Sequence, residues 1–391
     1  MTIADGVQSK ERCEWNGDDR LISPAEERIS LIQLFILIIL FQMGSAAVVG
    51  IGLDAGRDAW IAVLFATSFG VGLFRIYAYI PTLQPGMNLY ETIEALIGRK
   101  ASVILIWLYT IYFLYIAARV LRDFIELLIT STFPNTPMEM LTILFMLAII
   151  YTIYLGPEVF ARTSEIFFPY IVLFITVIGL LLLAGGDIHL ENMQPVLADG
   201  MMPVMEAVFP TMIGFPFGET FVFTVFLASV QNSQKVPKVG MLAVLLSGFL
   251  LTYMTIIILS VIGVDMAERS MFPLLNTVRE IALFDFIERL DALAVFTMMI
   301  GIHIKVTMFF FGGLKGLEYV FRIPYRSFTF PIGTIVTFFT IMIASNFAEH
   351  IQEGIELVPL YLHIPFLVII PFLLAFTIWI KKRKGGSQLH V

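Results

Sequence analysis

The residues with the clearest chemical potential lie in one short stretch, residues 209–219, which reads FPTMIGFPFGE. This stretch sits inside an apolar segment, residues 203–230, that is long enough to cross a bilayer. A spanning helix must satisfy its backbone polar groups internally, and two prolines and two glycines in close succession oppose that. We therefore expect the helix to break here and to expose N–H and C=O groups beside the carboxylate of Glu219. Because broken helices occur at membrane depth where they line a cavity, the stretch predicts half of a binding site.

The first apolar segment, residues 30–52, has small residues near its midpoint that suggest the other half. Small residues permit either local unwinding or close approach of a neighbouring helix, and the sequence leaves both open. If the helix unwinds, its outer half starts here with free N–H groups that suit a carboxylate. The carbonyls that end the first half of the sixth segment would suit an ammonium group. The expected ligand-contacting residues are Gly44, Ser45, Ala46, Ala47, Ile213, Gly214, Phe215, Pro216, Phe217, Gly218 and Glu219.

Together these groups fit a zwitterionic amino acid, although a sugar or nucleoside would be able to use the same backbone through neutral hydrogen bonds. Two ionisable residues in apolar surroundings are candidates for coupling. Such groups are costly in a membrane and are functional by default. For Glu219 we expect a ligand or proton role, or else a structural carboxylate. Lys305 lies in the apolar context GIHIKVTMFFF and is either functional or reaches toward the headgroups.

A polar stripe marks the third apolar segment. Tyr112, Tyr115, Arg119 and Arg122 are spaced three, four and three residues apart, so they share one helix face. A lipid-facing arginine is improbable, and we expect this face to look into the protein or toward a partner subunit.

The elements that must position these residues are membrane-spanning helices. The chain has 391 residues, of which 58% are hydrophobic and 14% charged, against about 25% charged in globular proteins. Ten segments are each long enough to cross a bilayer. They are residues 30–52, 59–80, 101–129, 138–156, 163–184, 203–230, 236–264, 289–312, 329–347 and 358–380. The sequence thus predicts an all-α membrane protein with one ten-helix domain, residues 29–381, between a polar leader, 1–28, and a basic tail, 382–391.

Charge and topology complete this prediction. Most lysines and arginines outside the apolar segments fall in the leader, the tail and the loops on the same side, so both termini are expected in the cytoplasm. No phosphate-binding loop, catalytic triad or metal-ligand cluster is present in the sequence, which argues against an enzyme and against a cofactor. Segments one and six open two five-helix halves of opposite orientation, and interruptions at such corresponding positions are typical of transporter sites.

The chain resembles the spore germination permeases, the B-type membrane subunits of germinant receptors in endospore-forming bacteria. The resemblance is carried by Ile29-Ser30 with Gln33-Leu34-Phe35, by Gly44-Ser45-Ala46, by the AGRDAW motif of residues 55–60, and by residues 215–219, FPFGE. It covers nearly the whole chain after residue 28.

This resemblance implies membership of the amino acid–polyamine–organocation superfamily and a LeuT-like fold of five plus five helices, with helices 1 and 6 broken. It also implies a subunit that senses small germinants in the inner membrane of the spore or in the cell membrane, together with an A-type membrane subunit and a lipid-anchored C-type subunit. In sodium-coupled relatives helices 1 and 8 hold an ion at about the depth of Lys305, so its ammonium is a candidate tethered cation. A proton-coupled amino acid transporter and a scaffold whose ligand binds elsewhere are the alternatives.

Overall fold

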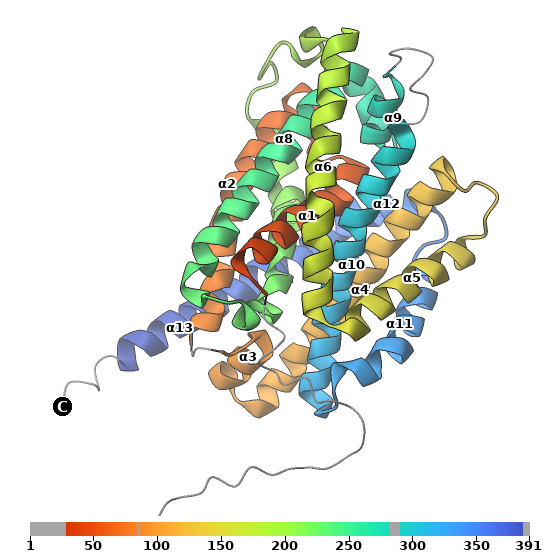
Figure 1. The fold of residues 1–391 in the computed structure, drawn as a ribbon. Coiled ribbons are helices and arrows are strands. Elements are labelled where there is room, and N and C mark those ends of the chain that lie inside the picture. Colours follow the sequence, from red (N-terminus) through yellow and green to blue (C-terminus); the bar gives the residue numbers. More distant parts are fainter. Residues whose placement is uncertain (1–28, 84–85, 282–289, 386–391) are drawn as a thin grey trace, which may run out of the picture.

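The computed structural model describes residues 29–83, 86–281 and 290–385, so the predicted leader and the end of the predicted tail lie outside it. The long helices of this part run side by side in one bundle (Figure 1). Its α-helices are α1 (Leu31–Val49), α2 (Ala59–Tyr79), α3 (Leu89–Ile97), α4 (Arg99–Ser131), α5 (Met138–Leu155), α6 (Pro157–Gly185), α7 (Met202–Ala207), α8 (Val236–Arg269), α9 (Pro273–Arg279), α10 (Leu290–Phe321), α11 (Tyr325–Met342), α12 (Phe347–Val358) and α13 (Ile370–Gly385). Irregular helical turns, η4 (Val208–Phe217), η5 (Gly218–Val225) and η8 (Pro359–Ile369), continue some of them.

Nine stretches of the described chain are long and apolar enough to cross a membrane, and they match nine of the ten predicted segments. The exception is segment 329–347, which corresponds to the 18-residue α11. Arg326, Ser327 and several threonines lower the mean hydropathy of this helix. The helical membrane architecture is therefore as predicted, whereas the count of ten spans stays a prediction.

The first helix begins at a well-defined cap. The Ser30 hydroxyl accepts from the Gln33 backbone N–H, while the Gln33 side chain accepts from the Ser30 N–H. Just before this cap, Ile29 pairs with Val230 in a single parallel bridge. The bonds run from the Ile29 N–H to the Ser229 carbonyl (3.3 Å) and from the Gln231 N–H to the Ile29 carbonyl (2.9 Å). The start of α1 is thus tied to the end of the sixth span, which is the predicted segment of residues 203–230.

The break expected within residues 44–47 is absent, because α1 continues as a regular helix from Leu31 to Val49. The backbone leaves the helix only afterwards, at Gly50 and Gly52, where φ is 69° and 71°. Serine and alanine are compatible with a helix, and Gly44 serves close approach instead. A Cβ at Gly44 would lie 2.7 Å from the Gly301 carbonyl oxygen of α10. The sequence left open whether residues 44–47 unwind or allow close approach of a neighbouring helix. The structure shows close approach of α10.

The sixth span is irregular at its prolines. The backbone leaves helical geometry at Phe209 (φ −115°, ψ 127°) and again at Phe215 (φ −119°, ψ 125°). Each of these residues precedes a proline, whose ring disfavours the helical conformation of its predecessor. The interruption at Phe215 lies just before Pro216, four residues from Glu219. Helical turns resume through η5, which places Glu219 on a short, tightly wound segment.

The interruption lies in the most enclosed part of the bundle. The sixth span, α1 and α10 are the most buried of the nine candidate spans in the described chain. α10 packs along both α1 and α4, and α2 packs along α8. The loop helix α9 has its apolar side turned inward, with Leu275 and Val278 buried. Chemistry-bearing residues of α1, η5 and α10 are therefore shielded from lipid by the other helices.

Candidate functional site

A buried ion pair joins the sixth span to α10. The Lys305 ammonium nitrogen lies 2.5 Å from a carboxylate oxygen of Glu219, and the two side chains are 0% and 2% exposed. Lys305 also donates to the Ser45 hydroxyl of α1 at 2.7 Å. Three predicted site residues from three separate spans thus meet at one ammonium group. Because Lys305 is fully enclosed, it does not reach toward a headgroup.

Aromatic rings complete the surroundings of the ammonium group. Its nitrogen lies 4.4 Å from the centre of the Phe215 ring and 5.3 Å from that of Phe41. Both distances are within the range of cation–π attraction. The extended conformation at the sixth-span break positions Phe215 for this contact. The lysine charge is thus stabilised by a carboxylate, a hydroxyl and two rings.

The predicted site residues next to the break are closely packed rather than open. A Cβ at Gly214 would lie 2.6 Å from the Cβ of His363 in η8. A Cβ at Gly218 would lie 2.6 Å from the Ile213 carbonyl oxygen. Phe217 fills the space above Gly70 of α2, where a Cβ would come within 2.6 Å of its ring, and Pro216 is buried. The glycines are needed for these contacts, so this arrangement of the site is closed.

The predicted residues of α1 divide between two faces. Ser45 reaches Lys305, whereas Met43 and Ala47 line an apolar cavity of about 30 Å³ between α1, α6, α8 and α10. Residues two apart on a helix point in nearly opposite directions. Ala46 is buried, and Gly44 packs on Gly301. Residues 44–47 therefore do not line a single pocket with the sixth-span break, and Ser45 is their contact with the ion pair.

A third irregular segment, η8, lies against the break and was missed from the sequence. Its His363 packs on Gly214, and the His363 Nδ1 lies 2.8 Å from the Tyr112 hydroxyl of α4. Pro371 lacks an N–H to bond carbonyls one turn earlier. Tyrosine hydroxyls serve instead, from Tyr109 to the Phe366 carbonyl (2.9 Å) and from Tyr77 to the Leu367 carbonyl (2.5 Å). The spacing of Pro359, Pro365 and Pro371 was the available signal.

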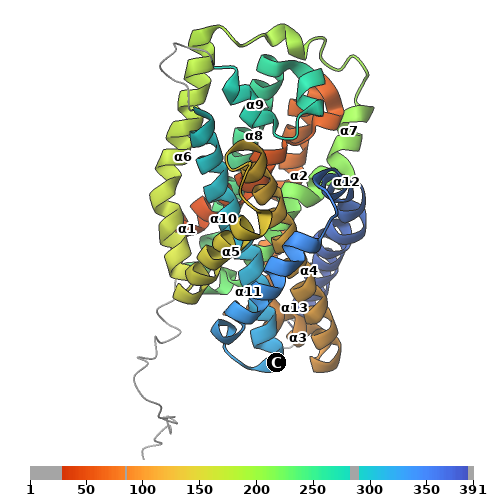
Figure 2. The same ribbon diagram turned by 90° about the vertical axis from the view of Figure 1, so that its right-hand side faces the viewer.

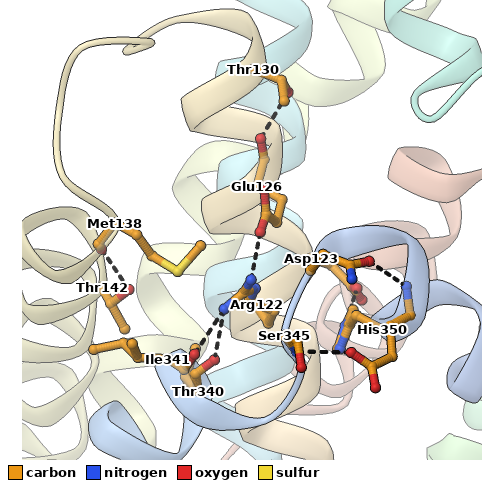
Figure 3. Close-up of polar contacts among 12 residues, drawn as sticks. Arg122, Asp123, Glu126, Thr130, Met138, Thr142, Thr340, Ile341, Ser345 and His350 are labelled. Carbon is orange, nitrogen blue, oxygen red and sulfur yellow. Dashed lines mark hydrogen bonds and ion pairs between the residues drawn. The ribbon is translucent and has the colours of Figure 1, made fainter.

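The polar stripe of α4 faces the protein interior. Tyr112, Arg119 and Arg122 are all buried, which confirms that the stripe does not face lipid. Arg122 pairs with Glu126 at 2.8 Å and donates to the Ile341 carbonyl at 3.0 Å (Figure 3). These charges lie in a separate cluster, farther along α4 than Tyr112. Among the described residues, no His, Cys, Asp or Glu side chains gather in a group of three or more that could hold a metal ion.

Comparisons with known proteins agree with this picture. Residues 28–349 match the family described as "Spore germination protein". The chain is 38% identical to spore germination protein KB of Bacillus subtilis (strain 168), over 92% of this chain and 97% of that protein. It is 22% identical to spore germination protein B2 of the same organism, over 94% and 99%.

Solved structures of transporters share the fold. The nucleobase–cation symporter MHP1 superposes with a TM-score of 0.63 at 13% identity, over 82% of this chain and 73% of that one. MhsT, in complex with L-phenylalanine, superposes with a TM-score of 0.58 at 14% identity, over 90% and 87%. The fold is thus the LeuT-like transporter fold. With the family match extending over most of its length, the chain belongs to the spore germination protein family.

Proposed function

We propose that this chain is the membrane subunit of a spore germinant receptor and that it senses a small zwitterionic germinant, an amino acid, at the junction of α1, the sixth span and α10. The observation that carries the proposal is the enclosed contact of Lys305 with Glu219 and Ser45. A carboxylate and an ammonium group side by side present the complement of an amino acid. The ligand carboxylate would pair with Lys305, and its ammonium group with Glu219.

An exchange of ion-pair partners explains how the buried charges of Glu219 and Lys305 are neutralised both without and with a ligand. A buried charge that loses its only partner is strongly disfavoured. In the empty state the two residues neutralise each other, and in the bound state each would be neutralised by the ligand. Inserting a ligand between them would move α10 away from the sixth span and release Ser45. Binding would thereby favour a second arrangement of the helices.

That second arrangement is the signal in this proposal. It would pass to an A-type membrane subunit and a lipid-anchored C-type subunit in the inner membrane of the spore. The relatives named as germination proteins KB and B2 support this role, since one matches nearly the full length of this chain at 38% identity. Both termini would lie in the cytoplasm, following the distribution of lysine and arginine.

The test is equilibrium binding of labelled amino acids to the receptor complex purified with its partner subunits. N-acetylated and carboxamide derivatives remove one ligand charge at a time. We expect Glu219→Gln to weaken binding of the free amino acid by about tenfold or more, the worth of a charged hydrogen bond. Binding of the N-acetyl derivative should not weaken, because its carboxylate pairs with the Lys305 that the substitution leaves without a partner. The Glu126→Gln variant, which alters a carboxylate outside the site, is the matched control. Equal affinities in the native protein and in Glu219→Gln would refute this site.

A proton-coupled amino acid transporter is the second candidate. It is favoured by the transporter fold and by a carboxylate placed at the interruption of the sixth span. Counterflow of labelled amino acid in proteoliposomes separates the two functions, since a sensor binds without exchange across the membrane. Binding that depends wholly on a partner subunit would instead identify this chain as a scaffold.

A further inference from the structure

The short helix α12 is lightly attached to the rest of the bundle. Among the described elements, its backbone packs most closely against its own continuation, η8, and it stands at the edge of the molecule (Figure 2). Of its twelve residues only Phe347, His350 and Val358 are buried. The Phe347 ring lies 5.8 Å from that of Phe272, and with so few other buried side chains the polar contacts of α12 contribute much of its attachment.

Two charged residues of α4 make those polar contacts. The Asp123 carboxylate lies 2.8 Å from Nε2 of His350 (Figure 3). Arg119 donates to the His350 backbone carbonyl, and its guanidinium lies 3.4 Å from the Glu353 carboxylate. Gly354 makes room for this approach, because a Cβ there would lie 2.8 Å from the Arg119 guanidinium. One turn of α12 is thus held by Arg119 and Asp123.

Arg122, the next arginine of α4, contacts a different helix. The contacts to α12 are therefore separable from those that hold the bundle together. Arg122 donates to the carbonyl of Ile341 near the end of α11, where backbone carbonyls have no helical partner, and it pairs with Glu126. It therefore binds α4 to α11 rather than to α12. Releasing Arg119 and Asp123 would free α12 and leave the α4–α11 junction intact.

The connection between α12 and α13 is suited to bending. Wide helical turns over Pro359–Ile369 replace the regular helix, and prolines at 359 and 365 each remove a backbone donor. From α12 the polar stripe of α4 leads toward the ion pair. Arg119 lies seven residues beyond Tyr112, about 10 Å along the helix, and Tyr112 contacts the His363 that packs on Gly214.

We propose that α12 is a lid that bends at η8, latched to α4 by Arg119–Glu353 and Asp123–His350, and that release of this latch opens the route along α4 to the Glu219–Lys305 site. The latch is independent of which ligand the site accepts. It is therefore tested without any ligand, and failure of the lid would leave the proposed germinant site standing.

The experiment measures how fast a thiol reagent reaches a cysteine beneath the lid. The single native cysteine, Cys13, is replaced by serine, and Ile116→Cys, at a 2% exposed position one turn from Arg119, is the reporter. The protein is held in lipid nanodiscs so that both faces are accessible. Glu353→Arg places two guanidinium groups together and is expected to raise the labelling rate about fivefold, the worth of a modest ion pair. The control is Glu356→Arg, since in the described part of the chain Glu356 accepts hydrogen bonds from Gln352 of its own helix and pairs with no residue of α4, and the rate should stay within about twofold.

Restoring the Arg119–Glu353 ion pair with exchanged charges tests whether this pair holds α12 in place. The double variant Arg119→Glu with Glu353→Arg is expected to return labelling toward the native rate. Gly354→Ala displaces the Arg119 side chain without a change of charge, and it replaces the double variant if that protein does not accumulate. Unchanged labelling in both Glu353→Arg and Gly354→Ala would overturn the proposal. Equal acceleration by Glu353→Arg and Glu356→Arg would overturn it as well, because it would indicate general loosening of α12.

Discussion

Replacing Lys305 by methionine removes the ammonium group but keeps a side chain of similar length. The Glu219 carboxylate, 2% exposed, then loses its ion-pair partner, and the Ser45 hydroxyl loses its donor. Breaking a buried ion pair from one side costs about 3–5 kcal/mol. For a chain of this size we expect the apparent Tm to fall by roughly 6–10 °C.

The double variant Lys305→Met with Glu219→Gln distinguishes an ion pair from two independent contacts. It leaves no unpaired charge, and replacing both members of a buried pair is often nearly neutral. We expect it to recover at least about half of the lost stability, so that the two substitutions are strongly non-additive. Thermal unfolding of the purified protein, followed by intrinsic fluorescence or by size-exclusion chromatography after heating, measures all three variants. Additive losses, or a single Lys305→Met variant as stable as the native protein, would refute the pair as described.

Three further outcomes follow from the packing and the topology. Gly44→Ala should destabilise by about 1–3 kcal/mol in thermal unfolding because its Cβ would lie 2.7 Å from the Gly301 backbone, whereas Gly72→Ala, with nothing within 4 Å, should not. His363→Leu should cost about 1–3 kcal/mol in the same assay by leaving the Tyr112 hydroxyl unpaired, and the cost should vanish in a background of Tyr112→Phe. A cysteine at Asp187 should react with an impermeant reagent applied outside the cell and one at Lys238 should not, and the reverse pattern would invert the topology.

The sequence predicts local breaks better than it predicts contacts between helices. Phe215 leaves the helix because Pro216 constrains it directly, an effect confined to adjacent residues. The outcome at Gly44 is decided by Gly301, more than 250 residues later, so the same small residues were compatible with unwinding or packing. Nothing in the neighbourhood of Gly44 along the chain distinguishes the two.

The candidate site was predicted in composition but not in geometry. Glu219 and Lys305 were each recognised as candidate site residues, because an ionisable group in an apolar membrane segment is costly unless it has a function. Their mutual contact depends on how the sixth span packs on α10, which no short sequence pattern encodes. The contribution of His363 was missed for the same reason: it lies more than 140 residues from the glycine on which it packs.

The bridge between Ile29 and Val230 constrains the direction in which the site can open. It fastens the first residues of α1 to the end of the sixth span, and Ser45 lies sixteen residues farther along, about 24 Å up the helix. Because the bridge joins α1 and the sixth span at one end, any movement of one relative to the other should grow with distance from the bridge. When Lys305 releases Ser45, the two spans should separate at the end away from the bridge, on the predicted outer side, while the bridged ends stay together. Opening on one side alone would let a ligand bind and change the helix arrangement without releasing it on the other side of the membrane. This behaviour fits a sensor better than a transporter.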